Sequence, residues 1–223
     1  MRDLTLVFDL DGTLVDTAPD LIRGINHILA GDGIEPVPSA VIRAEISFGS
    51  RRMLEKSLAH RKASRSTADV DRLLASFLAY YADNIAVESR PFPGLVAMLE
   101  DYRRAGVRLA VCTNKRELHS IELLRQLRIE RLFAGIAGRD TFPVCKPHPD
   151  HLTGAVRLAG GDPARAVMVG DSDTDIKTAR AAGVPVIAVS FGYTDVPVHQ
   201  LGPDAVVDHY RQFPAALELV LAA

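Results

Sequence analysis

Two acidic residues stand close together near the start of the chain, directly after an apolar run. They are Asp9 and Asp11, and Gly12 and Thr13 follow them. Gly12 permits a tight turn whose backbone N–H groups can face an anion. A buried pair of like charges is costly unless a cation or a shared proton compensates. Segment 9–13 is therefore a candidate site for an anion and a metal, although a solvated Asp-Gly hairpin turn explains it equally well on its own.

Groups suited to phosphate oxygens occur at two later positions. Thr113 and Asn114 follow another apolar run and come at the start of an expected helix, where N–H groups and the helix dipole favour anions. Either residue can instead be an ordinary N-cap. Lys146 lies in a loop ahead of a further expected helix, where a lysine is most often a solvated charge.

A second acidic cluster follows a third apolar run and consists of Asp171, Asp173 and Asp175. At helical spacing Asp171 and Asp175 share one face, whereas Asp173 points roughly the opposite way. An acidic first turn stabilises a helix through its dipole. Three aspartates exceed that need, so the cluster is a candidate site for a hard cation that prefers oxygen ligands.

The candidate residues all follow short apolar segments rich in β-favouring residues, which indicate buried strands. These segments alternate with stretches of helical periodicity. The expected strands are residues 4–8, 107–112, 166–169 and 184–189, and the expected helices are residues 94–104, 115–127, 149–158 and 174–182. This alternation predicts an α/β fold, with a Rossmann-like parallel sheet flanked by helices. Ligands of such sheets bind outside the carboxyl ends of the strands, where the candidate residues fall.

The segment between the first two expected strands has a different pattern, with helical periodicity and no convincing strand. We expect an inserted all-helical domain at residues 16–89 and an α/β core made of residues 1–15 and 90–223. Segment 90–94 is rich in proline and ends in glycine, and each proline disfavours helix in the residue before it. This segment marks the return to the core.

The composition bounds the kind of protein and its partners. Of the 223 residues, 48% are hydrophobic and 24% are charged, the balance of a globular protein. The net charge of −2 provides no broad attraction for nucleic acid or an anionic membrane. No apolar run approaches the roughly 18 residues of a membrane span, so we expect a cytoplasmic monomer or homodimer. Cys112 and Cys145 are too few for a disulfide framework and lack the spacing of a zinc site.

Together these residues supply the parts of a phosphoryl-transfer site. Carboxylates can serve as nucleophile, proton donor and metal ligands, and Lys146 and nearby donors can bind phosphate oxygens. In their order and context, segment 9–13, Thr113, Lys146 and segment 170–175 resemble the four motifs of the haloacid dehalogenase superfamily. The inserted helices resemble the small cap domain of that superfamily.

The resemblance implies a chemical role for several residues. Asp9 would attack phosphorus to form an aspartyl-phosphate, while Asp11 would protonate the leaving alcohol and then activate water. Thr113 and Lys146 would hold the phosphoryl oxygens. Because an alkoxide leaving group needs a proton and a halide does not, Asp11 argues for phosphate ester hydrolysis over carbon–halogen cleavage.

The resemblance also implies a magnesium site and further substrate contacts. The carboxylate of Asp9, the main-chain carbonyl of Asp11 and the carboxylate of Asp171 would bind Mg²⁺. Asp175 would be either a further ligand or a partner that orients the ligands. Gly12 and Asn114 join Thr113 and Lys146 as expected contacts of the small phosphorylated substrate.

A narrower resemblance concerns the substrate. Segments 8–21 and 113–115 are similar to those of phosphoglycolate phosphatases, which makes 2-phosphoglycolate the first substrate to consider. The alternatives are a phosphomutase of the β-phosphoglucomutase type, a phosphatase for a sugar phosphate, nucleotide or pyrophosphate, and a noncatalytic phosphate-binding module. Thr13 resembles the phosphatases more than the mutases. Arg51 or Arg52 can bind a substrate carboxylate through a bidentate fork, or both can lie on a solvated helix face.

Three further polar residues carry weaker signals. Lys115 is a weaker candidate than Arg51 for the substrate carboxylate, because an exposed lysine in the first turn of a helix needs no special explanation. His148 and His151 lie three residues apart, but no third nitrogen or sulfur ligand follows at a zinc-like spacing. Both histidines are therefore expected at the surface.

Overall fold

The computed structural model describes residues 3–194 and 196–222, and its centre is a six-stranded parallel sheet with the strand order β5-β4-β1-β6-β7-β8. These strands are short and most of their residues are buried, as the apolar segments of the sequence predict. Their bounds are β1 Thr5–Phe8, β4 Arg108–Cys112, β5 Gly135–Ala137, β6 Ala166–Gly170, β7 Val186–Val189 and β8 Ala205–Val207.

The register of the three central strands brings distant parts of the chain to one edge. Phe8, the last residue of β1, pairs with Val111 of β4 on one side and with Val169 of β6 on the other. Because the strands are parallel, the residues that follow them emerge side by side. The expected phosphate and metal residues therefore leave the sheet at the same edge.

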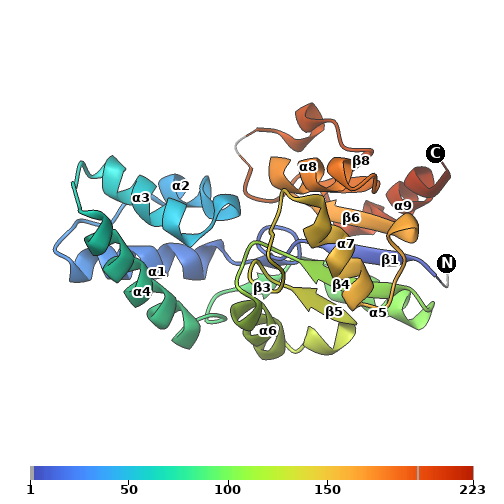
Figure 1. Cartoon of the computed structure of the whole chain (residues 1–223), viewed down its shortest axis with the longest axis horizontal. Helices are drawn as coiled ribbons and strands as arrows, with labels where there is room; N and C mark the ends of the chain where they lie inside the picture. Colours follow the sequence, from blue (N-terminus) through green and yellow to red (C-terminus); the bar gives the residue numbers. More distant parts are fainter. Residues whose placement is uncertain (1–2, 195, 223) are drawn as a thin grey trace.

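Two layers of helices cover the faces of the sheet, and alternate strand residues contact opposite layers (Figure 1). Phe8 and Val111 belong to the cluster that includes α5, α6 and α9, whereas Val7 and Ala110 belong to the cluster with α7 and α8. The helix bounds are α5 Leu95–Arg104, α6 Glu117–Gln126, α7 Pro149–Leu158, α8 Asp173–Ala181 and α9 Phe213–Ala222. Short 3-10 turns lie at η2 Glu130–Leu132, η3 Pro163–Arg165, η4 Val198–Leu201 and η5 Tyr210–Gln212.

Four further helices form a separate lobe beyond the carboxyl edge of the sheet, and both chain termini lie at the far end of the core (Figure 1). The lobe contains α1 Ala18–Gly31, α2 Ser39–Arg43, α3 Ser50–His60 and α4 Thr67–Asp83, with the 3-10 turn η1 Ile46–Phe48. A two-stranded antiparallel ribbon, β2 Val15–Asp16 and β3 Arg90–Pro91, joins the lobe to the core. The expected division into a core of residues 1–15 and 90–223 and an inserted domain of residues 16–89 stays a prediction.

Side chains at both ends of the lobe hold the connection in place. The buried Asp20 near the start of α1 accepts hydrogen bonds from the backbone N–H groups of Glu88 and Ser89 and from the Ser89 hydroxyl. Within the lobe, Ser66 and Asp69 form a capping box at the start of α4.

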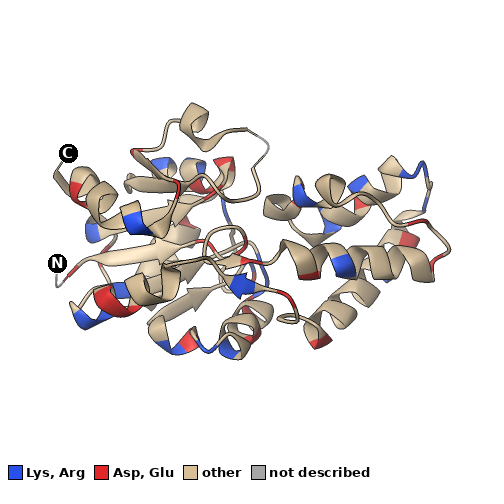
Figure 2. Cartoon of the chain, turned by 180° about the vertical axis from the view of Figure 1, so that it is seen from behind, with Lys and Arg blue, Asp and Glu red and all other residues tan. Residues whose placement is uncertain are grey.

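Basic and acidic residues are interspersed on the helices of both lobes, in keeping with the small net charge (Figure 2).

The α/β fold with a Rossmann-like parallel sheet is confirmed, and each of the four expected strands overlaps an observed one. Strands β2, β3, β5 and β8 are not among the expected strands. Each is only two or three residues long, which is too short to show a periodicity. None of the helices in the described ranges is both long enough and apolar enough to cross a membrane.

Candidate active site

Asp9 lies at the carboxyl end of β1, and the sheet itself fixes its backbone. Its N–H donates to the carbonyl of Val169 on the neighbouring strand at 2.9 Å. The side chain is buried, and one carboxylate oxygen lies 2.9 Å from Nζ of Lys146. Burial raises the pKa of Asp9 to about 6, although the Lys146 ammonium opposes this rise. Asp9 is thus a rigidly held carboxylate that depends on nearby positive charge to stay ionised.

The turn after Asp9 is expected to direct backbone N–H groups at an anion, but in the structure Gly12 instead packs against Asp171. Gly12 has a φ of 86°, and its N–H donates to the carbonyl of Val15 at 3.0 Å, so this N–H group is not free to bind an anion. A Cβ at this position would lie 2.5 Å from Oδ2 of Asp171. Gly12 therefore allows the turn to approach Asp171, and the expectation that its N–H contacts substrate is not met.

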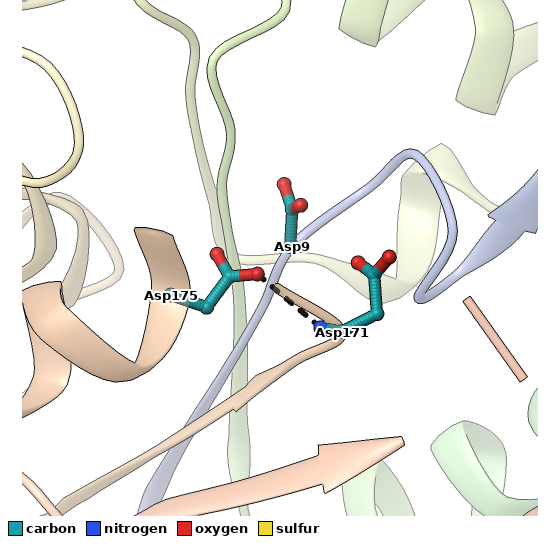
Figure 3. A group of neighbouring side chains, drawn as sticks. All are labelled: Asp9, Asp171 and Asp175. Carbon is teal, nitrogen blue, oxygen red and sulfur yellow. Dashed lines mark hydrogen bonds between the residues drawn. The ribbon is translucent and has the colours of Figure 1, made fainter. Parts of the chain in front are cut away.

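Asp171 follows β6 and Asp175 lies in the first turn of α8, and in Figure 3 their carboxylates flank that of Asp9. The Asp171 carboxylate accepts hydrogen bonds from the hydroxyl of Thr13 at 2.9 Å and from the N–H of Tyr193 at 2.8 Å. Burial, and then the Asp175 charge, raise the pKa of Asp171 well above its usual value. Carboxylate oxygens of Asp9, Asp171 and Asp175 all lie within 4.8 Å of one another.

The oxygens of Asp175 are already occupied by protein donors. Oδ1 lies 2.5 Å from Nζ of Lys146. Oδ2 accepts from the Ser172 hydroxyl at 2.6 Å and from the N–H groups of Asp171 and Ser172 at 3.2 and 3.1 Å. These contacts favour Asp175 as a residue that orients Lys146 and the loop that carries Asp171, and its role at the metal site stays a prediction.

Lys146 is buried between two carboxylates, not solvated as a lone loop lysine usually is. Burial opposes its charge, but Asp175 and Asp9 outweigh that effect and raise its pKa. The Lys146 carbonyl accepts from Nδ2 of Asn114 at 3.1 Å, so this amide group of Asn114 holds the lysine backbone. The ammonium lies at the edge of a pocket where phosphate oxygens can reach it.

His151 also holds Lys146, and sequence reasoning missed it. The expectation of a surface histidine is wrong, because His151 is fully buried on α7. Its Nδ1 accepts from the Lys146 N–H at 3.1 Å, which leaves Nε2 to donate to the carbonyl of Gly138 at 2.9 Å. Burial lowers the pKa of His151 to about 4, in keeping with a neutral ring. The helical spacing on an apolar face was the only signal in the sequence.

Thr113 and Lys115 occupy the loop between β4 and α6, which begins at Glu117. Neither Thr113 nor Asn114 is the N-cap of that helix, because Arg116 takes that position. Thr113 is buried beside the pocket, and its hydroxyl accepts from the Lys115 N–H at 3.2 Å. The Lys115 side chain is only 6% exposed, and Nζ lies 3.1 Å from Oδ1 of Asp11. The expectation of an exposed Lys115 is therefore wrong.

A pocket of about 190 Å³ lies between the core and the helical lobe, and it brings most of the expected residues together. This volume suits a small molecule better than a drug-sized one. Its core residues include Asp9, Asp11, Thr113, Asn114, Lys115, Arg116, His119, Arg139 and Lys146, and its lobe residues include Ser47, Gly49, Arg51, Leu78 and Tyr81.

Arg51 contributes to the pocket wall from α3, but its guanidinium binds acidic groups of the lobe itself. It contacts the Asp71 carboxylate and lies 3.6 Å from that of Glu55, and 46% of its side chain is exposed. Arg52 pairs with Glu45 at 2.8 Å, and its guanidinium lies 5.1 Å from the centre of the Phe48 ring. In this arrangement neither arginine presents an unpaired guanidinium to a substrate.

The donor set fits Mg²⁺. Carboxylate oxygens of Asp9 and Asp171 converge in a buried position, and a hard cation takes such oxygen ligands. Burial, together with the neighbouring carboxylates, raises the pKa of both Asp9 and Asp171, so their ionised forms need a compensating positive charge. A divalent cation would supply this charge.

Comparison with known proteins places this geometry in a family. The family model for haloacid dehalogenase-like hydrolases matches residues 6–189, which include the sheet edge and the inserted helices. The chain belongs to the haloacid dehalogenase-like hydrolases. The expectation drawn from the four motifs is thereby confirmed.

Relatives within this family share most of the chain. A phosphoglycolate phosphatase of Mesorhizobium japonicum is 51% identical over 92% of this chain and 90% of its own length. One of Agrobacterium fabrum is 44% identical over 95% and 91%. The crystal structure of a predicted phosphoglycolate phosphatase from Haemophilus somnus superposes with a TM-score of 0.90, at 29% identity over 97% of this chain and 99% of the other.

Proposed function

We propose that this haloacid dehalogenase-like hydrolase cleaves small phosphate monoesters with the help of Mg²⁺ and through an aspartyl-phosphate, and that 2-phosphoglycolate is its substrate. The observation that carries the proposal is the buried Asp9 carboxylate, which faces the pocket beside Lys146 and Asp171. The relatives support the reaction class, since curated proteins up to 51% identical are named phosphoglycolate phosphatases. The relatives and the family indicate a phosphoric monoester hydrolase, and the choice of 2-phosphoglycolate goes one step beyond that class.

In the first step a carboxylate oxygen of Asp9 forms a bond to phosphorus while the bond from phosphorus to the ester oxygen breaks. Asp11, two residues along the turn, gives its proton to the departing alkoxide. Lys146 and the Thr113 hydroxyl hold the phosphoryl oxygens, whose charge must be stabilised during transfer. Asp175 keeps the Lys146 ammonium in place.

In the second step water attacks phosphorus, Asp11 takes a proton from this water, and the bond between Asp9 and phosphorus breaks. The products are phosphate and the free Asp9 carboxylate. Mg²⁺, held by Asp9, the Asp11 carbonyl and Asp171, would supply positive charge for the phosphoryl oxygens.

Two further candidates remain within the same chemistry. A phosphomutase of the β-phosphoglucomutase type would return the phosphoryl group to a sugar instead of to water. A phosphatase for a sugar phosphate, nucleotide or pyrophosphate would share every residue of the core site. Thr13 favours a hydrolase by resemblance, and in the structure its hydroxyl donates to Asp171. We further propose that the protein acts in the cytoplasm as a monomer or homodimer.

A panel of phosphate esters tests the proposal. Phosphate release would be measured with Mg²⁺ for 2-phosphoglycolate, glucose phosphates, nucleotides, pyrophosphate and an aryl phosphate. We expect the highest kcat/KM for 2-phosphoglycolate and no release by the Asp9→Asn variant. Interconversion of glucose phosphates without net release would identify a mutase, and absence of turnover on every ester would contradict an enzymatic role.

A further inference from the structure

A buried lysine lies where the core meets the helical lobe. Nζ of Lys115 is 3.1 and 3.3 Å from the two carboxylate oxygens of Asp11, and the side chain is 6% exposed. The same Nζ lies 4.6 Å from the centre of the Tyr81 ring, which belongs to α4 of the lobe. Burying an ammonium costs desolvation free energy that an exposed lysine does not lose. A lysine held between the two lobes is therefore a candidate functional residue.

Tyr81 presents the matching group from the lobe. It is 2% exposed, stacks on Phe77 with ring centres 5.6 Å apart, and packs edge-on against His119 at 6.0 Å. Its hydroxyl is buried, lies close to the Lys115 ammonium and accepts no hydrogen bond of ordinary geometry within the described ranges, and Tyr81 lines the pocket. A buried hydroxyl without a partner costs free energy that a ligand acceptor would recover.

The position of Asp11 relates this pair to the substrate. In the proposed function Asp11 protonates the ester oxygen, so the rest of the departing alcohol must extend from a point within hydrogen-bond reach of Asp11. Lys115 is in direct contact with that same carboxylate. An ammonium has three N–H donors, so the contact with Asp11 leaves capacity for a further acceptor.

We infer that Lys115 and Tyr81 form a subsite for a carboxylate of the substrate, next to the phosphoryl site and between the two lobes. This inference rests on the proposed function and names the residues that select the alcohol part of the ester. The ammonium supplies a charge-assisted hydrogen bond, and the tyrosine hydroxyl supplies a second donor from the opposite wall. A carboxylate accepts both, whereas a methyl group in its place would leave both donors buried without an acceptor.

Arg51, the residue that the sequence favoured for this task, is less well placed. Its guanidinium would have to leave Asp71 and Glu55 before it could bind a substrate. Arg116 and Arg139 are exposed residues at the pocket wall, and no carboxylate within the described ranges pairs with either. These two add positive charge that attracts an anionic ester without fixing its orientation.

The test compares two esters that differ only at the proposed subsite. Ethyl phosphate has a methyl group where 2-phosphoglycolate has its carboxylate, and both release an alkoxide. The quantity measured is the ratio of kcat/KM for 2-phosphoglycolate to kcat/KM for ethyl phosphate. Effects that act through Asp11 change both rates in the same direction, so a large fall in the ratio reports loss of the carboxylate contact.

Two variants and one matched control suffice. Tyr81→Phe removes a single oxygen atom and should lower the ratio about tenfold, the effect of losing one hydrogen bond to a charged group. Lys115→Met should lower it by about 10²-fold, because the ammonium provides the charge. Tyr80→Phe makes the same change at the neighbouring residue of α4, which stacks on His27 instead, and should leave the ratio unchanged.

The outcomes separate this inference from the proposed function. An unchanged ratio in both Tyr81→Phe and Lys115→Met would overturn the subsite while the phosphatase assignment stands, as would a fall in the ratio confined to Arg51→Ala. Equal use of the two esters by the wild type would overturn the subsite as well. Absence of phosphate release from every ester would overturn the proposed function itself and this inference with it. Should Lys115→Met fail to fold by circular dichroism, Tyr81→Phe decides.

Discussion

Replacing Asp171 by Asn gives a sharp test of the metal site, because the structure predicts opposite effects with and without Mg²⁺. Carboxylate oxygens of Asp9, Asp171 and Asp175 lie within 4.8 Å of one another, and Lys146 is the ammonium that contacts two of these groups. The four side chains, all ionised, carry a net charge of −2 in a buried place. Removing one negative charge relieves this repulsion.

The amide can be accommodated without losing a hydrogen bond. The carboxylate of Asp171 accepts from the Tyr193 N–H and from the Thr13 hydroxyl. The amide oxygen can keep the first contact, and the amide nitrogen can donate to the Thr13 oxygen, because a hydroxyl accepts as well as donates. We therefore expect the metal-free variant to be more stable than the wild type by about 1–3 kcal/mol.

With Mg²⁺ bound, we expect the wild type to be more stable than Asp171→Asn. At one hundred times its dissociation constant, a ligand that binds only the folded state stabilises it by about 2.7 kcal/mol. For a chain of this size that corresponds to a rise in Tm of roughly 5–10 °C. Asp171→Asn lacks one of the two carboxylates proposed to bind the ion, so its Tm should scarcely respond. Thermal unfolding across a Mg²⁺ titration measures both effects.

The control is Asp173→Asn, two residues away on the exposed side of α8. Its carboxylate pairs with Lys177 at 2.5 Å and is not part of the buried cluster. This variant should keep the full response to Mg²⁺. If Asp171→Asn kept the wild-type response as well, Asp171 would not be a ligand, and a metal-free variant less stable than the wild type would refute the charge argument.

Three further changes test the rest of the site. Asp9→Asn should abolish turnover, and mass spectrometry should find no phosphoenzyme, because the amide cannot attack phosphorus. In the metal-free protein the folded-state pKa of Asp9 is raised from 3.8 to about 6, so the folded state binds the proton more tightly and stability is lost as pH rises through this window. Asp9→Asn should remove that loss, worth about 2 kcal/mol, when urea unfolding is compared at pH 4 and pH 7. His151→Leu should lower the free energy of unfolding by about 3 kcal/mol, because it leaves the Lys146 N–H and the Gly138 carbonyl buried without partners. A variant as stable as the wild type would contradict the role given to His151.

The sequence predicted the parts of the site that depend on local pattern. Apolar segments indicated the strands, and parallel strands send the residues that follow them to one edge of the sheet. The positions of Asp9, Thr113 and Asp171 at that edge follow from this rule. Strands β5 and β8 escaped notice because three residues show no periodicity.

Contacts between distant segments could not be read in the same way. Lys115 and His151 look like ordinary helix residues in the sequence. The structure shows that Lys115 is buried against Asp11 and that His151 is buried against the loop of Lys146. The same limit applies to Arg51, whose partner Asp71 lies on the next helix of the lobe. Spacing along one segment predicts a shared face, but it does not reveal what packs on that face.

Tyr193 shows how far the site depends on such contacts. Its N–H donates to the Asp171 carboxylate at 2.8 Å. Its hydroxyl donates to Asp16 at 2.7 Å and accepts from the N–H groups of Thr17 and Ala18, where the chain leaves the sheet for the helical lobe. Tyr193 therefore contacts the carboxylate proposed to hold Mg²⁺ through its backbone N–H, and the point at which the lobe departs through its hydroxyl. These contacts join segments that are far apart in the sequence. A change in the direction of the lobe would therefore move Tyr193 and, with it, the Asp171 carboxylate, although no residue that touches substrate is altered.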